Sequence, residues 1–584
     1  MVLVAEPVPQ LTVVPPETIS AAEPRHSDYV RYLAPMMYLY AIAMWAMGVM
    51  LVGDGAPAGQ YGLLATRGGL LLAVAMVATV ATFLYALAAR HLALAAVGIG
   101  IAILVQRVSV TLVTEIPIYT WTYKHIGLVD YLLVNHELAP ESVDVYNQWP
   151  GFFTAMAWFT TVAGVDPVTV AHWFAPATHL VTALLVAALA VGLGLDKRAA
   201  LAAAMLVELC NWVGQDYYSP QAVALILATA CLTLLAYSRR YPAAAYLSVL
   251  VFASLVATHQ LTPVWLCAAV VALAALRQIR PLWLPVVYVV ITLAYVVPRL
   301  GNVSRYGIFT GSNPMSNASS NVPTTGSAGR LFTMHVDRSL SVALWVAAIV
   351  CFLILWRRVG APWAAGIMAF SSMLLLGGQS YGGEAIFRVF LYSLPGCAVL
   401  IAPVLVGLLD GRRRLARLVA TPLVTLGLVA LCVASMQGYY GGWSYLTMTR
   451  TQLEQSRWLL ARNPEGATIT VLAPAGWPER PSADYVGHAT VDADYDKPLV
   501  TLKESLSDGF PTSSDIDRME QWTRGSGKTV YLVLPRQAGT YSDYYGLFRP
   551  GAMPALIDQL SSRPAWNKVI DDENTVVFTY AVQK

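Results

Sequence analysis

The stretch "LLLAVAMVATVATFLYALA" (residues 70–88) decides the fold class of this chain. No charged residue interrupts it, and a helix needs about 20 apolar residues to cross the hydrocarbon core of a bilayer. A second stretch of this kind is "LVTALLVAALAVGLGL" (180–195). The whole chain is 57% hydrophobic and 12% charged, whereas soluble domains have about 25% charged residues. We therefore expect an all-α polytopic membrane bundle.

Short basic loops indicate how the bundle lies in the membrane, because lysine and arginine collect in cytoplasmic loops. Neighbouring basic loops are separated by an even number of apolar segments, as they must be if all lie on one side. The pattern predicts about thirteen spans in the plasma membrane, with the N-terminus cytoplasmic and the C-terminus extracytoplasmic. The basic loops are 196–198, 238–240, 277–280, 357–358 and 411–414, and the predicted spans lie near 30–52, 69–89, 92–110, 172–195, 199–214, 220–237, 242–258, 261–276, 282–298, 339–356, 361–377, 386–408 and 418–436.

Composition divides the chain into three parts. Residues 1–29 are rich in Pro and Glu, which predicts a disordered cytoplasmic tail. Residues 30–444 contain the spans, and residues 445–584 are polar. In this last part, strand-like runs such as "ATITVLA" (467–473) alternate with helical stretches, which predicts an extracytoplasmic α/β domain.

Two long loops interrupt the transmembrane part, and the predicted topology places both outside. The first, 111–171, contains the short aromatic run "WPGFFTAMAWFTTVAG" (149–164), which predicts an interfacial or re-entrant helix. The second, 300–338, is rich in Gly, Ser and Asn. Such a loop is either a lid that orders on substrate binding or a plain linker.

Composition and motifs exclude several classes of function. A net charge of +3, without a basic patch that alternates with aromatic residues, gives no indication of nucleic-acid binding. The chain has no P-loop, GxGxxG, HExxH or CxxC motif, so neither a nucleotide nor a metal site is predicted and a divalent metal has no support. All six cysteines fall in apolar segments, where we expect buried free thiols.

The predicted external loops carry most of the varied polar residues, whereas the cytoplasmic loops are short and basic. We therefore expect the working face to be extracytoplasmic. Sugar transfer at that face would use donors activated on a lipid, such as polyprenyl-phosphate sugars. It needs a carboxylate to take the proton from the acceptor hydroxyl, cationic groups to stabilise the departing phosphate, and a groove for the lipid tail. The predicted partners are the bilayer, the lipid-linked donor and a glycan, lipid or protein acceptor.

The first loop supplies three candidates for the general base, namely Glu115, Asp130 and Asp144. Asp144 precedes Tyr146 and Trp149, which suggests hydrogen bonds to sugar hydroxyls beside an aromatic stacking face. The alternative is an interfacial aromatic belt. Further substrate-binding candidates in this loop are Lys124 and His125.

Three shorter external turns supply the other substrate-binding candidates. The turn "QDYYSPQ" (215–221) is either a capped turn or part of the pocket, and the histidine of "THQLTP" (258–263) is more typical of a structural residue. In "GGQSYGGEAIFR" (377–388), an i, i+4 spacing allows an ion pair, while the arginine would also suit a lipid phosphate. The candidates are Asp216, Tyr217, Gln221, His259, Gln260, Glu384 and Arg388.

The order of these parts resembles the C-type membrane glycosyltransferases, which include protein O-mannosyltransferases, cell-wall arabinosyltransferases and aminoarabinose transferases. The segment "YKHIGLVDYL…DVYNQWPGFFTAMAWFTTVAGVDP" (123–167) is similar to the family's acidic, Pro-containing aromatic and Gly-containing motifs. The resemblance implies sugar transfer from a polyprenyl-phosphate donor to an acceptor, such as a cell-wall or surface glycan. Many members carry an acidic pair just after the preceding helix, but "TWTYKH" (120–125) has none.

Two other classes of function are compatible with the sequence. A transporter or flippase would show inverted repeats and polar groups on both faces, and here polarity is concentrated on one face. A non-catalytic scaffold of envelope assembly is compatible with the missing acidic pair. A carboxylate beside a lipid-accessible groove would favour the transferase over the scaffold.

Overall fold

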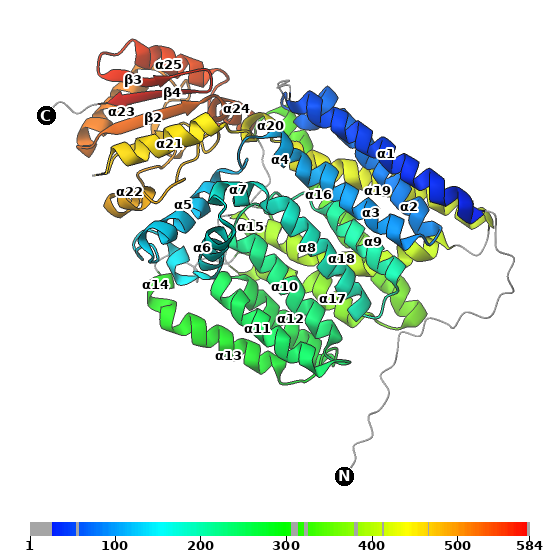
Figure 1. The fold of residues 1–584 in the computed structure, drawn as a ribbon. Coiled ribbons are helices and arrows are strands. Elements are labelled where there is room, and N and C mark those ends of the chain that lie inside the picture. The colour runs from blue at the N-terminus through cyan, green and yellow to red at the C-terminus, as the bar shows by residue number, and fades with distance from the viewer. Residues whose placement is uncertain are drawn as a thin grey trace.

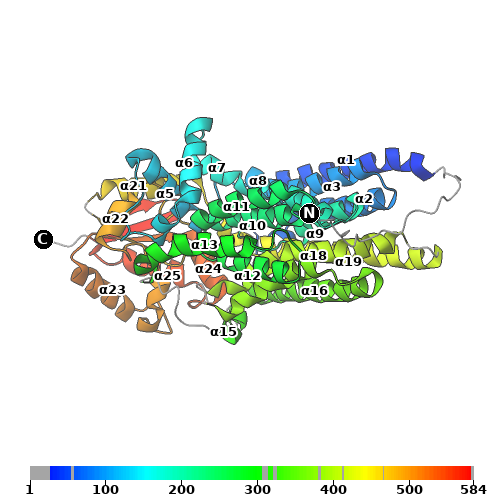
Figure 2. The same cartoon turned by 90° about the horizontal axis from the view of Figure 1, so that it is seen from below.

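The computed structural model describes residues 26–53, 58–304, 313–319, 325–378, 383–410, 414–464 and 466–580. It shows a helical bundle with a small sheet-containing domain at one end (Figure 1). Viewed from below, the molecule is elongated, and α1 (His26–Gly53) and α19 (Arg414–Tyr440) reach the end opposite the sheet (Figure 2). We refer to these two ends as the domain end and the far end of the bundle.

Nine helices of the described residues are long and apolar enough to cross a membrane, so the chain is a multi-pass membrane protein. Each corresponds to one of the predicted spans. They are α1, α2 (Arg67–Ala88), α3 (Leu92–Ile103) with α4 (Ser109–Val113), α8 (Phe174–Gly192), α10 (Pro220–Tyr237), α13 (Leu284–Val296) with the start of α14 (Leu300–Ser304), α16 (Ala328–Val359), α18 (Ala385–Leu409), and the apolar part of α19 with α20 (Trp443–Leu446).

The other four predicted spans fall on shorter helices. These are α9 (Lys197–Cys210), α11 (Pro242–Thr258), α12 (Thr262–Ala275) and α17 (Trp363–Phe370), which continues into the short helix η5 (Ser371–Gly377).

The centre of the bundle is α18, the most deeply buried of the nine long helices. It packs against α9, α16, α17 and α19. Small residues allow these close approaches. In α9, five alanines between residues 199 and 204 are buried, and a Cβ at Gly396 of α18 would lie only 2.2 Å from the backbone nitrogen of Ala369 in α17.

The first long loop folds into short helices at the domain end. They are α5 (Thr120–Asn135), η3 (Val145–Gln148), α6 (Gly151–Ala163) and α7 (Pro167–His172). Helix α6 matches the predicted short aromatic helix and leaves Trp158 and Val162 about two-thirds exposed, at 66% and 68%. Helix α5 packs against the C-terminal domain so closely that a Cβ at Gly127 would lie 2.3 Å from the carbonyl oxygen of Arg480.

The C-terminal residues form a four-stranded sheet with helices around it. The strand order is β1-β2-β4-β3, with β1 parallel to β2 and the other pairs antiparallel. The strands are β1 (Thr468–Val471), β2 (Val530–Pro535), β3 (Trp566–Asp571) and β4 (Thr575–Tyr580). The helices are α21 (Arg450–Arg462), α22 (Tyr485–Val491), η7 (Leu499–Ser505), α23 (Ser513–Ser526), α24 (Arg536–Tyr545) and α25 (Ala552–Ser561).

The structure differs from the predicted boundaries at the second long loop, 300–338. Residues 300–304 and 314–319 are short helices, and α16 begins at Ala328, so the last eleven residues of the predicted loop are helical. The predicted span began at residue 339 because the residues before it are polar. The helix itself begins earlier, since a helix can extend through polar residues on the N-terminal side of its apolar run. Residues 305–312 and 320–324 of this loop, and residues 1–25 of the predicted N-terminal tail, lie outside the described residues.

Candidate functional site

A cavity of about 580 Å³ lies at the domain end of the bundle. We call it the central cavity. Its walls come from α16, η5, α18 and the end of α19, together with α20 (Trp443–Leu446) and α24 of the C-terminal domain. Both parts of the molecule therefore contribute to it.

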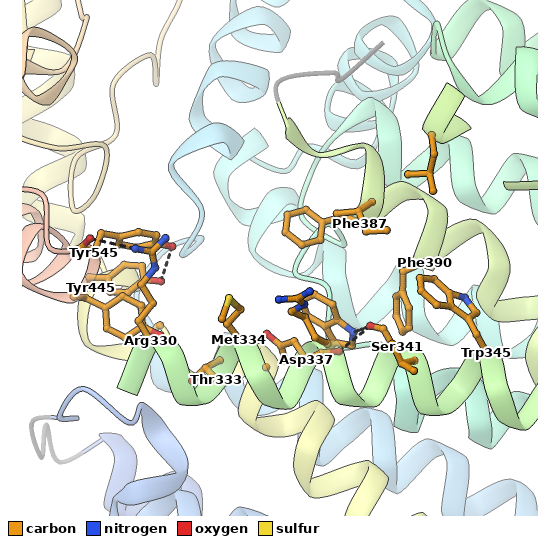
Figure 3. A pocket seen from close by; sticks show the side chains of 18 of the residues that line it. Arg330, Thr333, Met334, Asp337, Ser341, Trp345, Phe387, Phe390, Tyr445 and Tyr545 are labelled. Atoms are coloured by element: carbon orange, nitrogen blue, oxygen red, sulfur yellow. Dashed lines mark hydrogen bonds between the residues drawn. The ribbon is translucent and has the colours of Figure 1, made fainter. Parts of the chain in front are cut away.

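One face of α16 forms a long wall of the central cavity. Its residues follow one another at intervals of three or four positions, which places them on one side of a helix. Figure 3 shows these side chains along the helix, in the order Arg330, Thr333, Asp337, Ser341 and Trp345.

The Asp337 side chain is the unusual member of this face. It is 9% exposed, and no donor among the described residues reaches its Oδ1 atom. Because a buried polar atom without a hydrogen bond costs free energy, buried polar atoms are almost always paired. The unpaired oxygen therefore marks a position where a ligand could supply the missing partner.

The length of α16 indicates where Asp337 lies relative to a membrane. The helix has 32 residues, or about 48 Å, which exceeds the hydrocarbon thickness of about 30 Å. Arg357 and Arg358 occupy its last turn at the far end, and a paired arginine favours the interface. Asp337 is about 20 residues, or about 30 Å, from Arg357. The carboxylate thus falls at the opposite boundary of the apolar layer.

The two arginines of the cavity have different roles. Arg330 donates to the carbonyl oxygens of Thr325 (2.9 Å) and Tyr545 (3.1 Å) and lies 4.2 Å from the centre of the Tyr545 ring. It therefore joins α16 to α24. Arg338 follows Asp337 directly, lines the cavity and is exposed. Within the described part of the chain it has no ion-pair partner, so its guanidinium is available to an anion.

Aromatic rings form the apolar part of the cavity wall. The indole N–H of Trp212 donates to Oγ of Ser341 (3.1 Å). The Trp212 ring lies 5.7 Å and 5.6 Å from those of Phe387 and Phe390. Because its polar atom is satisfied, the indole can serve as an apolar surface.

The cavity reaches the outer surface of the bundle along α16. Val342 lines the cavity and is also 55% exposed. Exposed apolar side chains continue from it towards the far end of the same helix, where a bilayer would cover them. These are Val346, Ile349, Val350 and Leu353. A lipid tail could therefore lie on this apolar stripe while its head group occupies the cavity.

Three predicted residues meet in a polar network behind the Phe387 side of the cavity. Arg388 contacts Glu384 (Nη2 to Oε2, 3.0 Å) in the predicted i, i+4 ion pair. The Nε–H of Arg388 also donates to Oε1 of Gln221 (2.6 Å). Gln215 completes the network by donating to Glu384 (3.1 Å) and accepting from Gln221 (2.9 Å). Predicted residues from two different turns are thus brought together.

Asp216 belongs to a separate buried network of four ionisable groups. Its Oδ2 atom lies 3.1 Å from Nη1 of Arg107 and 3.0 Å from Nε2 of His179. The Nδ1 atom of His179 lies 2.6 Å from Oε2 of Glu208, and Arg107 is 3.5 Å from that carboxylate. With both carboxyl groups ionised, each only accepts a hydrogen bond, and both imidazole nitrogens then carry protons. The network then contains two positive and two negative charges, and it holds α3 to α4, α8 and α9 together.

The three predicted bases do not line the central cavity. Glu115 accepts a hydrogen bond from the backbone nitrogen of Arg450 (2.7 Å) at the start of α21. Asp130 accepts one from the backbone nitrogen of Ala483 (2.8 Å). Both carboxylates therefore attach the first loop to the C-terminal domain.

Asp144 is buried and paired within the first loop. It accepts from the backbone nitrogen of Tyr146 (3.0 Å) and lies 2.5 Å from Nζ of Lys124. The Lys124 ammonium lies 5.2 Å from the centre of the Tyr146 ring. Trp149 is almost completely buried, at 2% exposure. Lys124, Asp144 and Tyr146 thus form a cluster around an ion pair, and Trp149 follows it through a backbone hydrogen bond to Tyr146 (3.0 Å).

The predicted histidines occupy structural positions. Nδ1 of His125 donates to the carbonyl oxygen of Tyr218 (2.9 Å), and its ring stacks on Tyr217 at 6.0 Å. Burial, together with the charge of Lys124, lowers the pKa of His125 to about 3. His259, which precedes Gln260, accepts from the backbone nitrogens of residues 261 and 262 at the start of α12. Burial lowers the pKa of His259 to about 3 as well. Both imidazoles are therefore neutral.

The sequence did not predict Asp337, Arg338, Arg107 or His179 as site residues. The first two precede the apolar run of α16, and the other two lie inside apolar runs. Arg330, Asp337 and Ser341 are separated by seven and four positions, and this helical spacing is the sequence pattern from which the cavity face of α16 could have been predicted. In the described part of the chain, no three His, Cys, Asp or Glu side chains come together as a metal site would require.

Comparison with known proteins gives structural neighbours only. No protein-family model and no curated protein matches the chain. The oligosaccharyltransferase of Archaeoglobus fulgidus aligns with a TM-score of 0.46 at 12% identity, over 81% of this chain and 71% of that one. ArnT from Cupriavidus metallidurans, bound to undecaprenyl phosphate, aligns with a TM-score of 0.44 at 12% identity, over 78% of this chain and 93% of that one. The arabinofuranosyltransferase AftD from Mycobacteria aligns with a TM-score of 0.46 at 14% identity, over 85% of this chain and 40% of that one.

These alignments report what the chain is similar to in fold, at 12–14% identity. Each of these TM-scores is below 0.5, so the likeness by itself assigns no activity to the chain.

Proposed function

We propose that the chain transfers a sugar from a polyprenyl-phosphate donor to an extracytoplasmic acceptor, and that the reaction takes place in the central cavity. The observation that carries this proposal is the buried carboxylate of Asp337, whose Oδ1 atom is unpaired, in a cavity that the next residue, Arg338, also lines. Glycosyl transfer requires a proton acceptor and a cation for the leaving phosphate. Asp337 and Arg338 are the candidates for these two roles, and both line the central cavity.

The proposed orientation places the far end of the bundle in the cytoplasm. Basic residues from several connections gather there. Arg198 donates to the carbonyl oxygen of Leu87 (3.0 Å) and pairs with Asp410 (2.6 Å), and Arg357 and Arg358 end α16. Because basic residues favour the cytoplasmic side, the domain end and the central cavity face the other side.

In the proposed reaction, Asp337 accepts the proton of an acceptor hydroxyl. The hydroxyl oxygen forms a bond to the anomeric carbon of the donor sugar. The bond from that carbon to the phosphate oxygen breaks, and its electron pair leaves with the polyprenyl phosphate. Arg338 stabilises the negative charge that develops on the phosphate, because guanidinium groups bind phosphate oxygens through two parallel hydrogen bonds.

The donor lipid has a path into this site. Its phosphate would lie near Arg338 at the boundary of the apolar layer, and its isoprene units would follow the exposed apolar stripe that begins at Val342. The aromatic wall around Trp212 offers a stacking surface for the sugar. Aromatic rings are well suited to this because the axial C–H groups of a sugar form an apolar face.

The unpaired carboxylate favours a transferase over a scaffold. A scaffold gains nothing from a buried carboxylate oxygen that lacks a partner, and such an oxygen is costly to keep. A transferase gains a proton acceptor from it. The roles of Glu115, Asp130 and Asp144 as bases remain alternatives that the same assay tests.

The experiment uses the full chain in lipid nanodiscs with a panel of radiolabelled polyprenyl-phosphate sugars and a mixture of glycan acceptors. We expect one donor to lose its sugar to an acceptor. A chain that binds a donor and never transfers its sugar would be a scaffold. A chain that moves the donor between leaflets without breaking it would be a flippase.

A further inference from the structure

A second cavity, of about 210 Å³, lies between helix α5 and the C-terminal domain. We call it the interdomain pocket. Trp121 and Lys124 line it from α5, and Glu479, Arg480 and Asp496 line it from loops of the domain. Figures 1 and 2 both show α5 next to the domain, close to α22. The pocket is separate from the central cavity, because the two share no lining residue.

The charged groups of the interdomain pocket are already paired. Arg480 makes two contacts with Asp496, from Nε (2.5 Å) and from Nη2 (2.7 Å). Lys124 pairs with Asp144 at 2.5 Å. At the rim, Lys497 lies 3.4 Å from Asp494. Three cations therefore face three carboxylates, and the pocket has no excess charge that would attract an ionic ligand.

Glu479 is the exception in this pocket. Its Oε1 atom is buried, and no described residue donates to it or accepts from it. Burial, followed by the negative charge of Asp496, raises the pKa of Glu479 to about 8, against the opposing charges of Arg480 and Lys124. The side chain therefore holds its proton at neutral pH. A protonated carboxyl group both donates and accepts hydrogen bonds, as a sugar hydroxyl does.

Apart from Thr120, the remaining walls are apolar. Trp121 is 58% exposed and presents its ring at the pocket. Pro474 and Pro498 line the domain side. An aromatic face beside neutral hydrogen-bonding groups suits a ligand that is apolar on one face and hydroxylated at its edge. The volume is about seven times that of a water molecule in the liquid, which fits one sugar ring and not a long chain.

We propose that the interdomain pocket binds one neutral sugar residue of the acceptor glycan, with Trp121 stacking on the ring and Glu479 bonding to a hydroxyl group. This assignment of the acceptor rests on the proposed function. It gives the C-terminal domain a role in holding the acceptor, because the domain contributes Glu479 and the bundle contributes Trp121. An anionic sugar is disfavoured relative to a neutral one, because each cation of the pocket already has a carboxylate partner.

Saturation-transfer NMR on the full chain in nanodiscs, without donor, tests the proposal. The probes are methyl α-mannopyranoside, methyl α-arabinofuranoside and methyl β-glucopyranoside, with glucuronate as the anionic comparison. We expect a neutral glycoside to receive saturation from the wild type. Trp121→Ala and Glu479→Ala reduce the signal to background. Glu479→Gln retains it, because the amide is neutral and also donates and accepts.

The pH dependence gives a second readout. Between pH 7 and pH 9, Glu479 loses its proton and the hydrogen bond that it donates, so the wild-type signal falls. The groups that face it are Asp496 and Arg480 from the domain and Lys124 from α5, and the glutamine variant keeps all three. The signal of Glu479→Gln therefore stays constant over this range.

Three results would overturn the proposal: no neutral glycoside binds, binding is unchanged in both alanine variants, or only glucuronate binds. The assay contains no donor, so its outcome is separate from that of the transfer reaction. If the chain binds glycosides through Trp121 and Glu479 but transfers no sugar, the proposal for the pocket stands and the proposed transferase function is wrong. If the chain transfers sugar but the pocket variants do not change glycoside binding, only the assignment of the pocket to the acceptor is wrong.

Discussion

Gly438 of α19 lies directly against the carboxylate of Asp337. A Cβ at this glycine would be 2.1 Å from Oδ1 of Asp337 and 2.9 Å from Cβ of Trp212. The absence of a side chain on α19 therefore creates the space that the unpaired carboxylate occupies.

The substitution Gly438→Ala should displace the Asp337 side chain and abolish most sugar transfer. The control is Gly427→Ala on the same helix, where an added Cβ meets nothing within 4 Å. This control should keep wild-type turnover, since alanine favours a helix over glycine by about 1 kcal/mol. Equal turnover in the two variants, measured with the radiolabelled donor, would contradict the position of Asp337 in the site.

The buried network around Asp216 should be essential for stability. Arg107→Met removes one of the two cations that face the two buried carboxylates, and breaking a buried pair in this way costs about 3–5 kcal/mol. We expect the melting temperature of the purified chain in detergent to fall by many degrees. Arg90→Met is the control, because the Arg90 side chain is 73% exposed and 3.9 Å from Asp410. Its melting temperature should match that of the wild type.

The contact between Asp130 and the backbone of Ala483 should fix the C-terminal domain against α5. Asp130→Ala removes the acceptor and should increase hydrogen exchange around residues 480–485. Asp130→Asn retains a carbonyl oxygen at the same position and should exchange nearly as slowly as the wild type. If both variants lost sugar transfer while exchange stayed slow, Asp130 would have a chemical role instead.

Glu479 should make the stability of the chain depend on pH. Its carboxyl group ionises near its ordinary value of 4.5 in the unfolded chain and near pH 8 in the folded chain. The folded state therefore binds more protons in this interval, so raising the pH towards 8 favours unfolding. We expect the melting temperature to fall from pH 5 to pH 8 in the wild type and to change less in Glu479→Gln. Parallel curves for the two proteins would mean that Glu479 is ionised in the folded state.

The bundle was predictable from the sequence, whereas the central cavity was not. Apolar runs such as residues 70–88 specify helices that cross a membrane, because bilayer thickness sets their length. The position of Asp337 in the cavity depends on a different property, namely that α16 continues beyond its apolar part. A hydropathy pattern ends where charges begin, but the backbone hydrogen bonds of a helix continue through Arg338 and Asp337.

The roles of the predicted carboxylates depended on contacts between distant parts of the chain. Glu115 and Asp130 have the residue type and the loop position that catalysis requires, yet their partners, Arg450 and Ala483, lie more than three hundred residues later. No local pattern predicts such a pairing. By contrast, the pair of Glu384 and Arg388 was predictable, because an i, i+4 spacing on one helix brings the two side chains together.

The most direct test of the account is sugar release from the radiolabelled lipid donor by Asp337→Asn, beside Glu115→Gln, Asp130→Asn and Asp144→Asn. Asparagine keeps the shape of the side chain and cannot accept the proton. General-base catalysis contributes about 10²–10⁴-fold, so Asp337→Asn should lose at least about 100-fold in turnover while its melting temperature stays near that of the wild type. Wild-type turnover in Asp337→Asn, with activity lost in one of the three loop variants, would contradict the account and identify the loop carboxylate as the base.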